Sequence, residues 1–577
     1  MNNNKYKLIF DFLHDGNNLK AFFKNPLHII TTKDPKEVAS CLERIDQAIN
    51  EGYYVAGYMA YEAAAYFYPE ISFKSEANLP LLWFGLFKEK LKIPHTLQDS
   101  PFTVSTWEPV ISRDEYNQDF SALQGKIISG EMEQINYTIR MGAQFSGDDY
   151  AYYQQLAKAQ ESNYSAYLRI DHYSILSASP ELFFHIKDRK ITTKPMKGTV
   201  SRAYSYEEDK IKANWLKNSE KNQRENLVSV HLMKEELKEI AKPNSINVPI
   251  KFEIEQYPTV FQMTSTVTAD LKDLVRTKDI FKSLFPSSSI TGFPKVNTMK
   301  IINKYEKDPR FIYCGALGYF TPDHEAIFNV PIRTVYIDHH TNKAIYGVGG
   351  AIMEDSTSTE EYEEIIAKAR ILTKKTVHFH LLETIALKSG EYILLENHLE
   401  RLKQSARYFN FKYDEEDLKK RLEKIRLDQQ ANKYMVRVLL KKSGHITIEV
   451  KKLRESYKNT FVKLAKAPIQ IDTPFIFHKT TKREMYERLL TQGSFDTLLW
   501  NDRGEVTEFT KGNIVVKIDG EFLTPPISSG LLPGTFRKSL LEQEKIKERV
   551  ILKEDLSRSE AIYFINSVRE WVEVKLI

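Results

Sequence analysis

The sequence pattern changes once, at about residues 372–377, and this change most constrains the fold. Residues 359–374 have the spacing of a charged amphipathic helix that leads into the basic pair Lys374-Lys375. A strand-like run, VHFHLLETIAL, begins directly afterwards at Val377. Because 577 residues exceed the usual length of one domain, we predict two domains, 1–373 and 376–577.

The composition is that of a globular, water-soluble chain. Hydrophobic residues make up 42% and charged residues 28%, which excludes disordered, collagenous and membrane compositions. The net charge of +5 is too small to favour nucleic acid or a membrane surface as a partner. Cys41 and Cys314 are too few for a disulfide framework, and we find no signal segment or membrane span, so we expect a cytoplasmic protein.

Both predicted domains mix helices with strands, which indicates an α+β (mixed α/β) fold. Residues 163–199 alternate apolar and polar side chains between turn pairs, as consecutive hairpins do. Residues 206–241 have the spacing of long charged helices. Strands are predicted at 311–320, 325–337, 343–348, 433–440, 446–451, 497–500 and 513–517, and helices at 397–409, 414–426 and 482–491.

Two carboxylates and a lysine fall on one face of a predicted helix. Glu361, Glu364 and Lys368 have helical spacing and follow a glycine-rich turn predicted at Gly347 to Gly350. Paired carboxylates suit Mg²⁺, a hard cation that prefers oxygen ligands. The same spacing is more often found on a solvated Glu/Lys face, so the pattern alone leaves both readings open.

A second candidate is Lys197, next to Gly198 at the end of a predicted strand and one hairpin away from Glu181. A partly desolvated lysine has a lowered pKa and can supply a neutral amine that attacks carbon. Most lysines beside turns are simply exposed, and the isolated pattern does not decide between the two.

The order of several motifs resembles that of the chorismate-binding enzymes, over residues 50–373. The motifs are QINYT at 134–138, SPE at 179–181, KGT at 197–199, SITGFPK at 289–295, YCGALGY at 313–319, VPIRT at 330–334, and the glycines followed by the EYEE helix. The resemblance implies the chorismate-utilising fold, with large antiparallel sheets.

The resemblance also implies roles for individual residues. A Lys before Gly-Thr is typical of aminodeoxychorismate synthase component I, where anthranilate synthases have Ala, so Lys197 would attack C2 of chorismate while Glu181 protonates the departing 4-hydroxyl. Mg²⁺ would be bound by Glu225, Glu361 and Glu364. The residues expected to contact the substrate are Arg333, Lys368, Gly349, Gly350, Thr199 and Tyr319. Asn222, His231 and Gln262 depart from the family pattern, and Asn222, which stands where the family usually has an acidic residue, leaves the metal site one charge poorer.

The second half resembles the class IV aminotransferases, most nearly the aminodeoxychorismate lyases, over about 378–577. The matching pieces are Leu382-Glu383-Thr384, His398 to Leu402, His478 to Thr481, Glu508 and the Leu-Pro-Gly-Thr turn at 532–535. By this resemblance Lys479 bonds covalently to pyridoxal 5'-phosphate (PLP) and moves a proton. Glu508 would face the pyridinium nitrogen, and Arg401 and Thr535 would hold the phosphate.

These resemblances predict a bifunctional enzyme of 4-aminobenzoate (folate) biosynthesis. Chorismate would be aminated to 4-amino-4-deoxychorismate, and a PLP-dependent elimination of pyruvate would follow. Neither cysteine has the context of a glutaminase nucleophile, so ammonia would come from solution or from a separate glutamine amidotransferase subunit.

A homodimer through the second domain is also implied. The alternatives are an anthranilate or isochorismate-type synthase fused to a class IV transaminase, and a non-catalytic chorismate-binding regulatory module.

Overall fold

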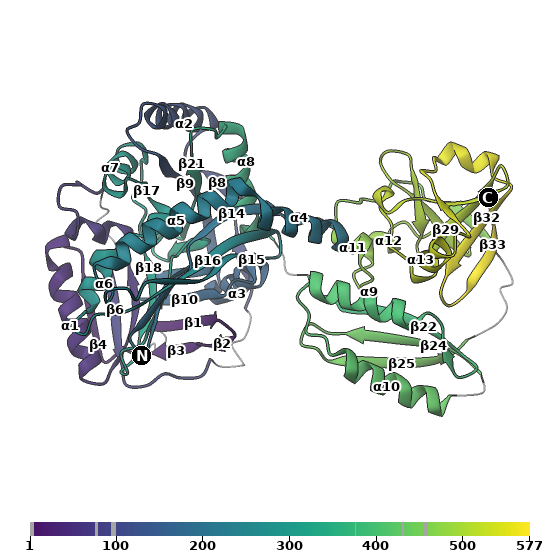
Figure 1. The fold of residues 1–577 in the computed structure, drawn as a ribbon, viewed down its shortest axis with the longest axis horizontal. Helices are drawn as coiled ribbons and strands as arrows, with labels where there is room; N and C mark the ends of the chain where they lie inside the picture. Colours follow the sequence, from purple (N-terminus) through teal and green to yellow (C-terminus); the bar gives the residue numbers. More distant parts are fainter. Residues whose placement is uncertain (1–4, 75–78, 94–99, 375–376, 430–431, 454–459) are drawn as a thin grey trace. The chain divides into compact units, whose positions relative to one another are not determined.

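The computed structural model describes residues 5–74, 79–93, 100–374, 377–429, 432–453 and 460–577. The chain forms two compact units (Figure 1). Unit 1 comprises Met1–Ser201 and Ala213–Thr376, and unit 2 comprises Arg202–Lys212 and Val377–Ile577. Residues 375–376 of the expected boundary lie outside the described residues. Among the described residues, none of the helices combines the length and apolar character that a membrane crossing requires.

Unit 1 contains two large antiparallel sheets, as predicted. The first runs in the order β17 (Gly292–Phe293), β9 (Gln134–Gly147), β21 (Lys343–Ile352), β20 (Thr334–Asp338), β11 (Tyr173–Ser179), β10 (Tyr164–Ile170), β1 (Tyr6–His14), β2 (Asn17–Asn18), with β3 (Ala21–Lys24) beside β1 and with β7 (Phe102–Val104) and β8 (Glu108–Pro109) beside β9. The second runs β14 (Met196–Ser201), β16 (Val260–Asp270), β13 (Lys190–Thr193), β12 (Leu182–Lys187), β19 (Ala326–Asn329), β18 (Ala316–Phe320), β5 (Tyr54–Met59), β6 (Leu82–Phe87), β4 (His28–Thr32), with β15 (Asn247–Gln256) beside β16.

The two sheets of unit 1 pack face to face, and helices cover their outer faces. The core between the sheets joins side chains of β1 and β10 to side chains of β5 and β18. The outer face of the second sheet packs against α1 (Val38–Asn50), α5 (Glu220–Lys238) and α6 (Thr277–Leu284). The outer face of the first sheet packs against α2 (Arg113–Ile128), α3 (Asp149–Gln160), α7 (Lys295–Tyr305) and α8 (Ser358–Ala369).

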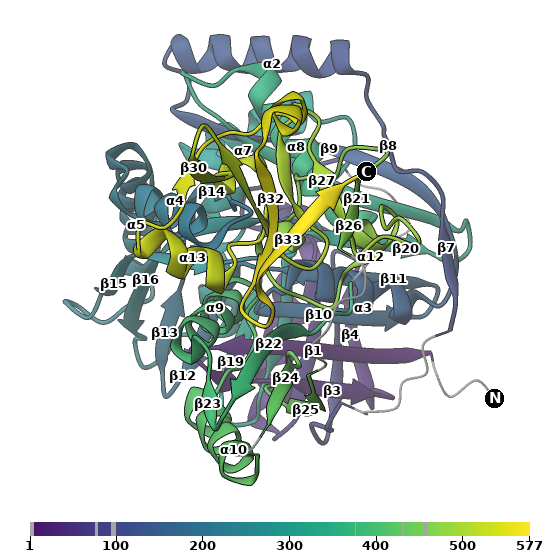
Figure 2. The ribbon, with the colours of Figure 1, turned by 90° about the vertical axis from the view of Figure 1, so that its right-hand side faces the viewer.

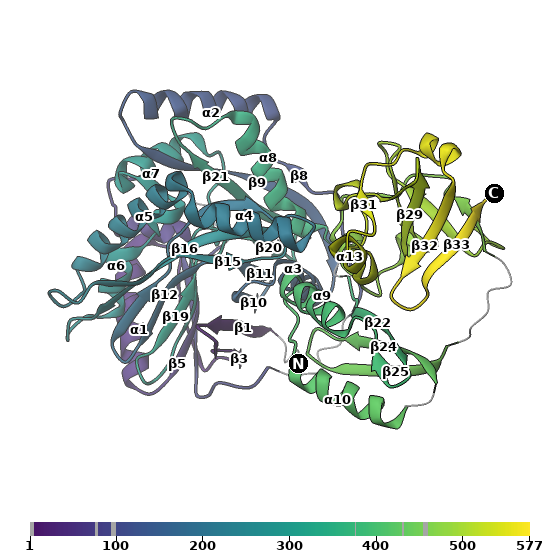
Figure 3. The same cartoon turned by 45° about the vertical axis from the view of Figure 1, so that its right-hand side comes forward.

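Unit 2 contains a smaller and a larger sheet. The smaller consists of β23 (Glu391–Tyr392), β22 (Leu381–Lys388), β24 (Lys433–Leu440) and β25 (Ile446–Lys452), and it shares a core with α9 (Leu395–Tyr408) and α10 (Glu415–Asp428) (Figure 3). The larger runs β28 (Val506–Phe509), β27 (Asp496–Trp500), β26 (Phe461–Leu464), β33 (Glu570–Leu576), β32 (Ala561–Asn566), β29 (Asn513–Ile518), β30 (Glu521–Thr524), β31 (Lys547–Glu548). Figure 2 shows β32 and β33 of this sheet side by side.

The remaining elements are short or connect the sheets. The helices are α4 (Tyr206–Asn218), α11 (Pro474–Phe477), α12 (Glu484–Glu487) and α13 (Thr535–Glu542). The 3-10 turns are η1 (Pro35–Glu37), η2 (Tyr61–Tyr66), η3 (Ser288–Ile290), η4 (Arg370–Leu372), η5 (Ile527–Ser529) and η6 (Lys553–Arg558). The hairpins predicted in 163–199 and the helices predicted in 206–241 are confirmed, whereas the helix predicted at 482–491 is only the short α12.

The turn predicted at Gly347 to Gly350 is wrong, because these glycines lie inside β21. They are needed there for close packing rather than for bending the chain. A Cβ on Gly347 would overlap the ring of Tyr313, and one on Gly349 would overlap the carbonyl of Tyr137 on β9. We call these glycines of β21, at positions 347, 349 and 350, the glycine wall.

Candidate active sites

One cavity of about 300 Å³ in unit 1 gathers nearly every residue predicted for the first site. β14, α5 and α8 supply most of its acidic and basic side chains, Glu181 and Arg333 come from the segments just before β12 and β20, and β21 supplies the glycine wall. The predicted residues that line it are Glu181, Lys197, Thr199, Glu225, Arg333, Gly349, Gly350, Glu361, Glu364 and Lys368.

Tyr319 is the exception, and the structure contradicts its assignment as a substrate contact. It does not line this cavity. Its ring packs against Phe10 and Phe23 in the core between the two sheets, and its hydroxyl donates to the carbonyl of Leu19 at 2.7 Å. Strand alternation explains the difference, since β18 turns Tyr319 toward one sheet face and Phe320 toward the other.

Glu181 lies in the short connection between β11 and β12, directly before Leu182, and is buried, with 5% of its surface exposed. Burial raises its pKa to about 7, while a hydrogen bond from the Ser289 hydroxyl to Oε1, at 2.5 Å, opposes that rise. At neutral pH a substantial fraction of this carboxyl is therefore protonated. It can donate a proton, as a general acid must.

Lys197 projects from β14 into the same cavity. Loss of hydration lowers its pKa, against the opposing charges of Glu225 and Glu181. Its ammonium has no hydrogen bond or ion pair to the described residues. Gly198 has φ +93°, and a Cβ there would lie 2.9 Å from Oδ1 of Asn222, so glycine lets α5 approach β14 beside this lysine.

The opposite side of the cavity carries cations suited to an anionic substrate. Lys368 donates to the Gly349 carbonyl at 2.8 Å and pairs with Glu364 at 2.6 Å. Burial alone would raise the pKa of Glu364, but Lys368 and Arg333 reverse this and lower it. The Arg333 Nη1 donates to the Lys368 carbonyl at 2.9 Å, which fixes one edge of the guanidinium and leaves other donors for a carboxylate.

The acidic residues of the cavity fit a bound Mg²⁺. Burial and the neighbouring charge of Glu364 raise the pKa of Glu361 to about 6, and a cation would relieve this repulsion. Among the described residues, the one group of three metal-type ligand atoms within 4.8 Å of each other is His172, Asp338 and His340, so the glutamates do not form a closed cage. Mg²⁺ usually keeps several waters and shares substrate oxygens, which suits such an open arrangement.

The three departures from the family pattern are not equivalent. His231 is exposed on α5 and does not line the cavity, so it has no direct effect on the site. Asn222 and Gln262 do line it. The Asn222 amide donates to the Ser219 hydroxyl at 2.8 Å, and the Gln262 amide donates to the Thr199 hydroxyl at 3.5 Å.

In unit 2 the predicted PLP residues are linked by buried polar contacts. Arg401 on α9 makes two hydrogen bonds to Glu383, at 2.8 and 2.7 Å, and a third to the Pro533 carbonyl at 3.3 Å. His398 contacts Glu383 at 2.7 Å and the Thr535 hydroxyl at 3.2 Å. These contacts hold the arginine, the threonine and the start of α13 together.

The groups of unit 2 match the chemical parts of PLP. Burial lowers the pKa of Lys479 to about 8, with Arg401 adding to the effect, so its amine is neutral more often than that of an ordinary lysine. α13 begins at Thr535 without a side-chain cap, which leaves backbone N–H groups for a phosphate. Burial raises the pKa of Glu508 to about 8, and it accepts hydrogen bonds from Tyr486 at 2.9 Å and Asn513 at 3.4 Å. A pyridinium nitrogen would favour its charged form.

Comparison with known families agrees with this division of the chain. The family model described as chorismate binding enzyme matches residues 12–374. The chain belongs to this family. Residues 380–577 match the model of amino-transferase class IV. As a chorismate binding enzyme, the chain thus carries a second family's domain after the first.

Curated relatives match part of the chorismate-binding region. Aminodeoxychorismate synthase component 1 of Salmonella typhimurium is 37% identical over 276 residues, which are 47% of this chain and 60% of the relative. The Bacillus subtilis protein of the same name is 34% identical over 269 residues, 47% of this chain and 57% of the relative. The chain thus spans somewhat more than half the length of these relatives. The crystal structure of anthranilate synthase component I from Streptococcus pneumoniae has a TM-score of 0.52 at 21% identity, covering 64% of this chain and 92% of that chain, and supports the fold.

Two contacts within the sites were not predicted from the sequence. Ser289 belongs to the SITGFPK motif, but its contact with Glu181 spans 108 residues and leaves no local signal. Tyr486 holds Glu508 across 22 residues, again with no periodic pattern to indicate it. Pairs of this kind can be identified only from the folded structure, which brings distant segments of the chain together.

Proposed function

We propose that this chain is a bifunctional enzyme that makes 4-aminobenzoate from chorismate. Unit 1 aminates chorismate to 4-amino-4-deoxychorismate, and unit 2 eliminates pyruvate from that product. The observation that carries the proposal is Lys197, an amine of lowered pKa that has no partner among the described residues and shares one cavity with the protonatable Glu181. The names of the matched relatives, aminodeoxychorismate synthase component 1, support the same substrate.

In unit 1 the amine of Lys197 bonds to C2 of chorismate while the C4–O bond breaks. Glu181 gives its proton to the departing hydroxyl, which leaves as water. Ammonia then bonds to C4 and the C2–N bond to Lys197 breaks, so the lysine is regenerated. Arg333 and Lys368 hold the substrate carboxylates during both displacements. Mg²⁺, held by Glu225, Glu361 and Glu364, would neutralise carboxylate charge.

In unit 2 the bound PLP supplies an electron sink for the elimination. Arg401, Thr535 and the start of α13 would hold its phosphate, and Glu508 would pair with its ring nitrogen. Lys479, with a pKa of about 8, takes a proton from the substrate carbon and returns it to the product. Loss of pyruvate leaves an aromatic ring, which makes the step strongly favourable.

Ammonia comes from solution or from a separate glutamine amidotransferase subunit. Both cysteines of the chain are buried. Burial raises the pKa of the Cys314 thiol to about 12 and also raises that of Cys41, so neither supplies the thiolate of a glutaminase. Dimerisation through unit 2 remains a prediction.

The test is product identification by mass spectrometry. The purified chain is incubated with chorismate, Mg²⁺, PLP and an ammonium salt. Equal amounts of 4-aminobenzoate and pyruvate are expected. Accumulation of aminodeoxychorismate would overturn the proposal for unit 2. Chorismate that survives even with a glutamine amidotransferase and glutamine would overturn the proposal for unit 1.

Matched variants assign each step to its lysine. Lys197→Ala should abolish aminodeoxychorismate formation, whereas Lys190→Ala, an exposed lysine on β13, should leave it unchanged. Lys479→Ala should stop 4-aminobenzoate formation and let aminodeoxychorismate accumulate. Lys482→Ala, which removes a surface partner of Glu484, is its control. Wild-type rates in Lys197→Ala would refute covalent participation of that lysine.

A further inference from the structure

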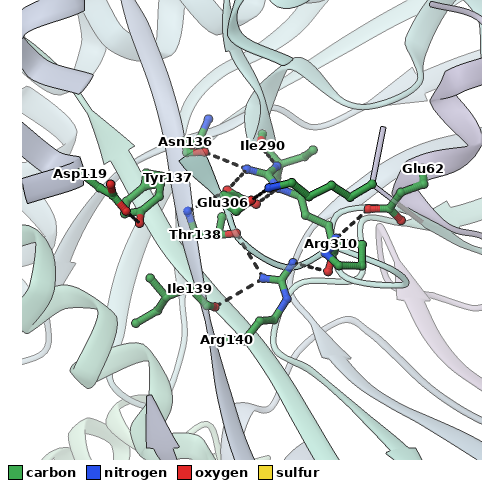
Figure 4. A network of polar contacts seen from close by, with 12 residues as sticks. Glu62, Asp119, Asn136, Tyr137, Thr138, Ile139, Arg140, Ile290, Glu306 and Arg310 are labelled. Carbon is green, nitrogen blue, oxygen red and sulfur yellow. Dashed lines mark hydrogen bonds and ion pairs between the residues drawn. The ribbon is translucent and has the colours of Figure 1, made fainter. Parts of the chain in front are cut away.

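A buried polar network lies behind the cavity of unit 1 and none of it is used by the chemistry above. Its centre is Arg310, whose side chain is 1% exposed (Figure 4). The guanidinium makes two hydrogen bonds to Glu306, at 2.9 and 2.6 Å. Its remaining bonds go to the backbone carbonyls of Ile290 and Asn136, each at 2.8 Å.

The two carbonyls belong to separate segments that both line the cavity. Asn136 lies on β9, and Ile290 lies on η3, next to the Ser289 that contacts Glu181. A planar guanidinium can hold two such segments at a fixed spacing, which an ammonium cannot do. Arg310 therefore helps to hold β9 beside η3, together with the backbone hydrogen bond from Asn136 to the Thr291 carbonyl at 2.8 Å.

The other members of the network hold Arg310 and β9 in place. Glu306 also accepts the backbone N–H of Thr138 at 2.9 Å, so one carboxylate fixes both the arginine and the strand (Figure 4). Glu62 accepts the backbone N–H groups of Arg310 and Phe311 at 2.6 and 3.0 Å. A buried ion pair of this kind contributes little net stability, so geometric precision is the better reason for its presence.

One side-chain atom of Asn136, a residue that lines the cavity, lacks a partner among the described residues. Nδ2 of Asn136 is buried and has no hydrogen bond to any described residue, although its residue lines the cavity. Leaving a buried donor unpaired is costly, and natural proteins usually satisfy such groups with a ligand or water. Asn136 lines the same cavity as Lys197 and Glu181, and its amide is a donor that suits an oxygen of an anionic substrate.

We propose that Asn136 binds the substrate of unit 1 by donating a hydrogen bond from Nδ2 to one of its oxygens, and that Arg310 positions Asn136 for this contact. The inference rests on the proposed function, because it takes chorismate as the ligand. It adds one specificity-determining residue and one positioning residue to the site.

The experiment measures kcat and KM for chorismate consumption by the full chain with Mg²⁺ and ammonium, together with thermal unfolding. Asn136→Ala should raise KM about 10-fold without a lower melting temperature, since one hydrogen bond to a charged ligand is lost. Asn136→Asp should raise KM further, because an anion would then face an anion. Asn214→Ala, an exposed asparagine on α4, is the control and should match the wild type.

Arg310→Lys tests the positioning role and keeps the charge opposite Glu306. It should lower kcat/KM about 10-fold or more while the chain remains folded, because an ammonium lacks the planar fork of donors that reaches both carbonyls and Glu306 at once. In the double variant Asn136→Ala/Arg310→Lys the two effects should be less than multiplicative, since both act through one contact. A purely structural arginine would lower the melting temperature and leave KM unchanged.

The outcomes separate the inference from the function on which it rests. If the wild type consumes chorismate and Asn136→Ala has the same KM, the inference is overturned and the proposed function stands. If Asn136→Ala is impaired but a folded Arg310→Lys is not, the positioning role of Arg310 is overturned. If the wild type neither binds nor consumes chorismate, the proposed function fails and the inference falls with it.

Discussion

Removal of the Ser289 hydroxyl should make unit 1 relatively more active at alkaline pH. This hydroxyl donates to Oε1 of Glu181 at 2.5 Å and stabilises the ionised carboxylate. The neighbouring charge of Lys197 acts in the same direction. The proposed mechanism needs Glu181 in its protonated form. The hydrogen bond from Ser289 lowers the protonated fraction of Glu181 at alkaline pH. In Ser289→Ala the pKa of Glu181 should therefore rise.

The size of the effect follows from the structure. With a pKa of about 7, Glu181 is about half protonated at pH 7, whereas a carboxyl of ordinary pKa 4.5 would be roughly 0.3% protonated. A hydrogen bond to a charged group contributes about 1.5 kcal/mol, and each pKa unit corresponds to about 1.4 kcal/mol. The alkaline limb of the rate profile should then move up by about one unit, to roughly pH 8.

The assay compares kcat/KM for chorismate between pH 6 and pH 9 in Ser289→Ala and the wild type. The ratio of variant to wild-type rate should rise about 8-fold across this range, and any pH-independent loss cancels from it. Ser288→Ala is the matched control, because that hydroxyl donates to Glu236 instead of Glu181. A ratio that stays constant or falls with pH would refute the role of Glu181 as the proton donor.

Three further predictions concern the glycine wall and unit 2. Gly350→Ala places a Cβ 2.8 Å from Oε2 of Glu361, so the dependence of rate on Mg²⁺ concentration should shift to higher concentration without a change in melting temperature. Arg401→Met removes the ion pair between Arg401 and the buried Glu383 and leaves Glu383 only its contact with His398, which should cost about 3–5 kcal/mol in urea unfolding and weaken PLP binding in an absorbance titration. The rate of PLP uptake by Lys479 should rise about 10-fold per pH unit and level off near pH 8; a rise that continues to pH 10 in stopped-flow absorbance would contradict its lowered pKa.

The local sequence was enough to predict those site residues that belong to short sequence motifs. Lys197 and Glu181 stand beside glycine or proline at strand ends, and α8 has clear helical spacing, so these residues could be named in advance. The glycines of β21 were misread because glycine runs favour turns in isolation. Glycine is needed at position 347 because a Cβ there would overlap the ring of Tyr313, and this contact is seen only in the folded structure.

Contacts between residues far apart in the sequence could not be predicted from local sequence patterns. Arg310 reaches back to Asn136 across 174 residues, and Glu62 reaches forward to Arg310 across 248. No periodicity joins such pairs. Tyr319 illustrates the opposite error, since membership of a motif does not say which face of a strand a side chain occupies.

The glycine wall of β21 limits which substitutions can change the shape of this cavity. A side chain at Gly349 would push β21 away from β9, and one at Gly347 would displace the buried ring of Tyr313, so such changes should fail as folding defects before they alter selectivity. The facing helices α5 and α8 offer long, adjustable side chains instead. A search for variants with a new substrate should therefore randomise the helix positions and leave the two glycines fixed.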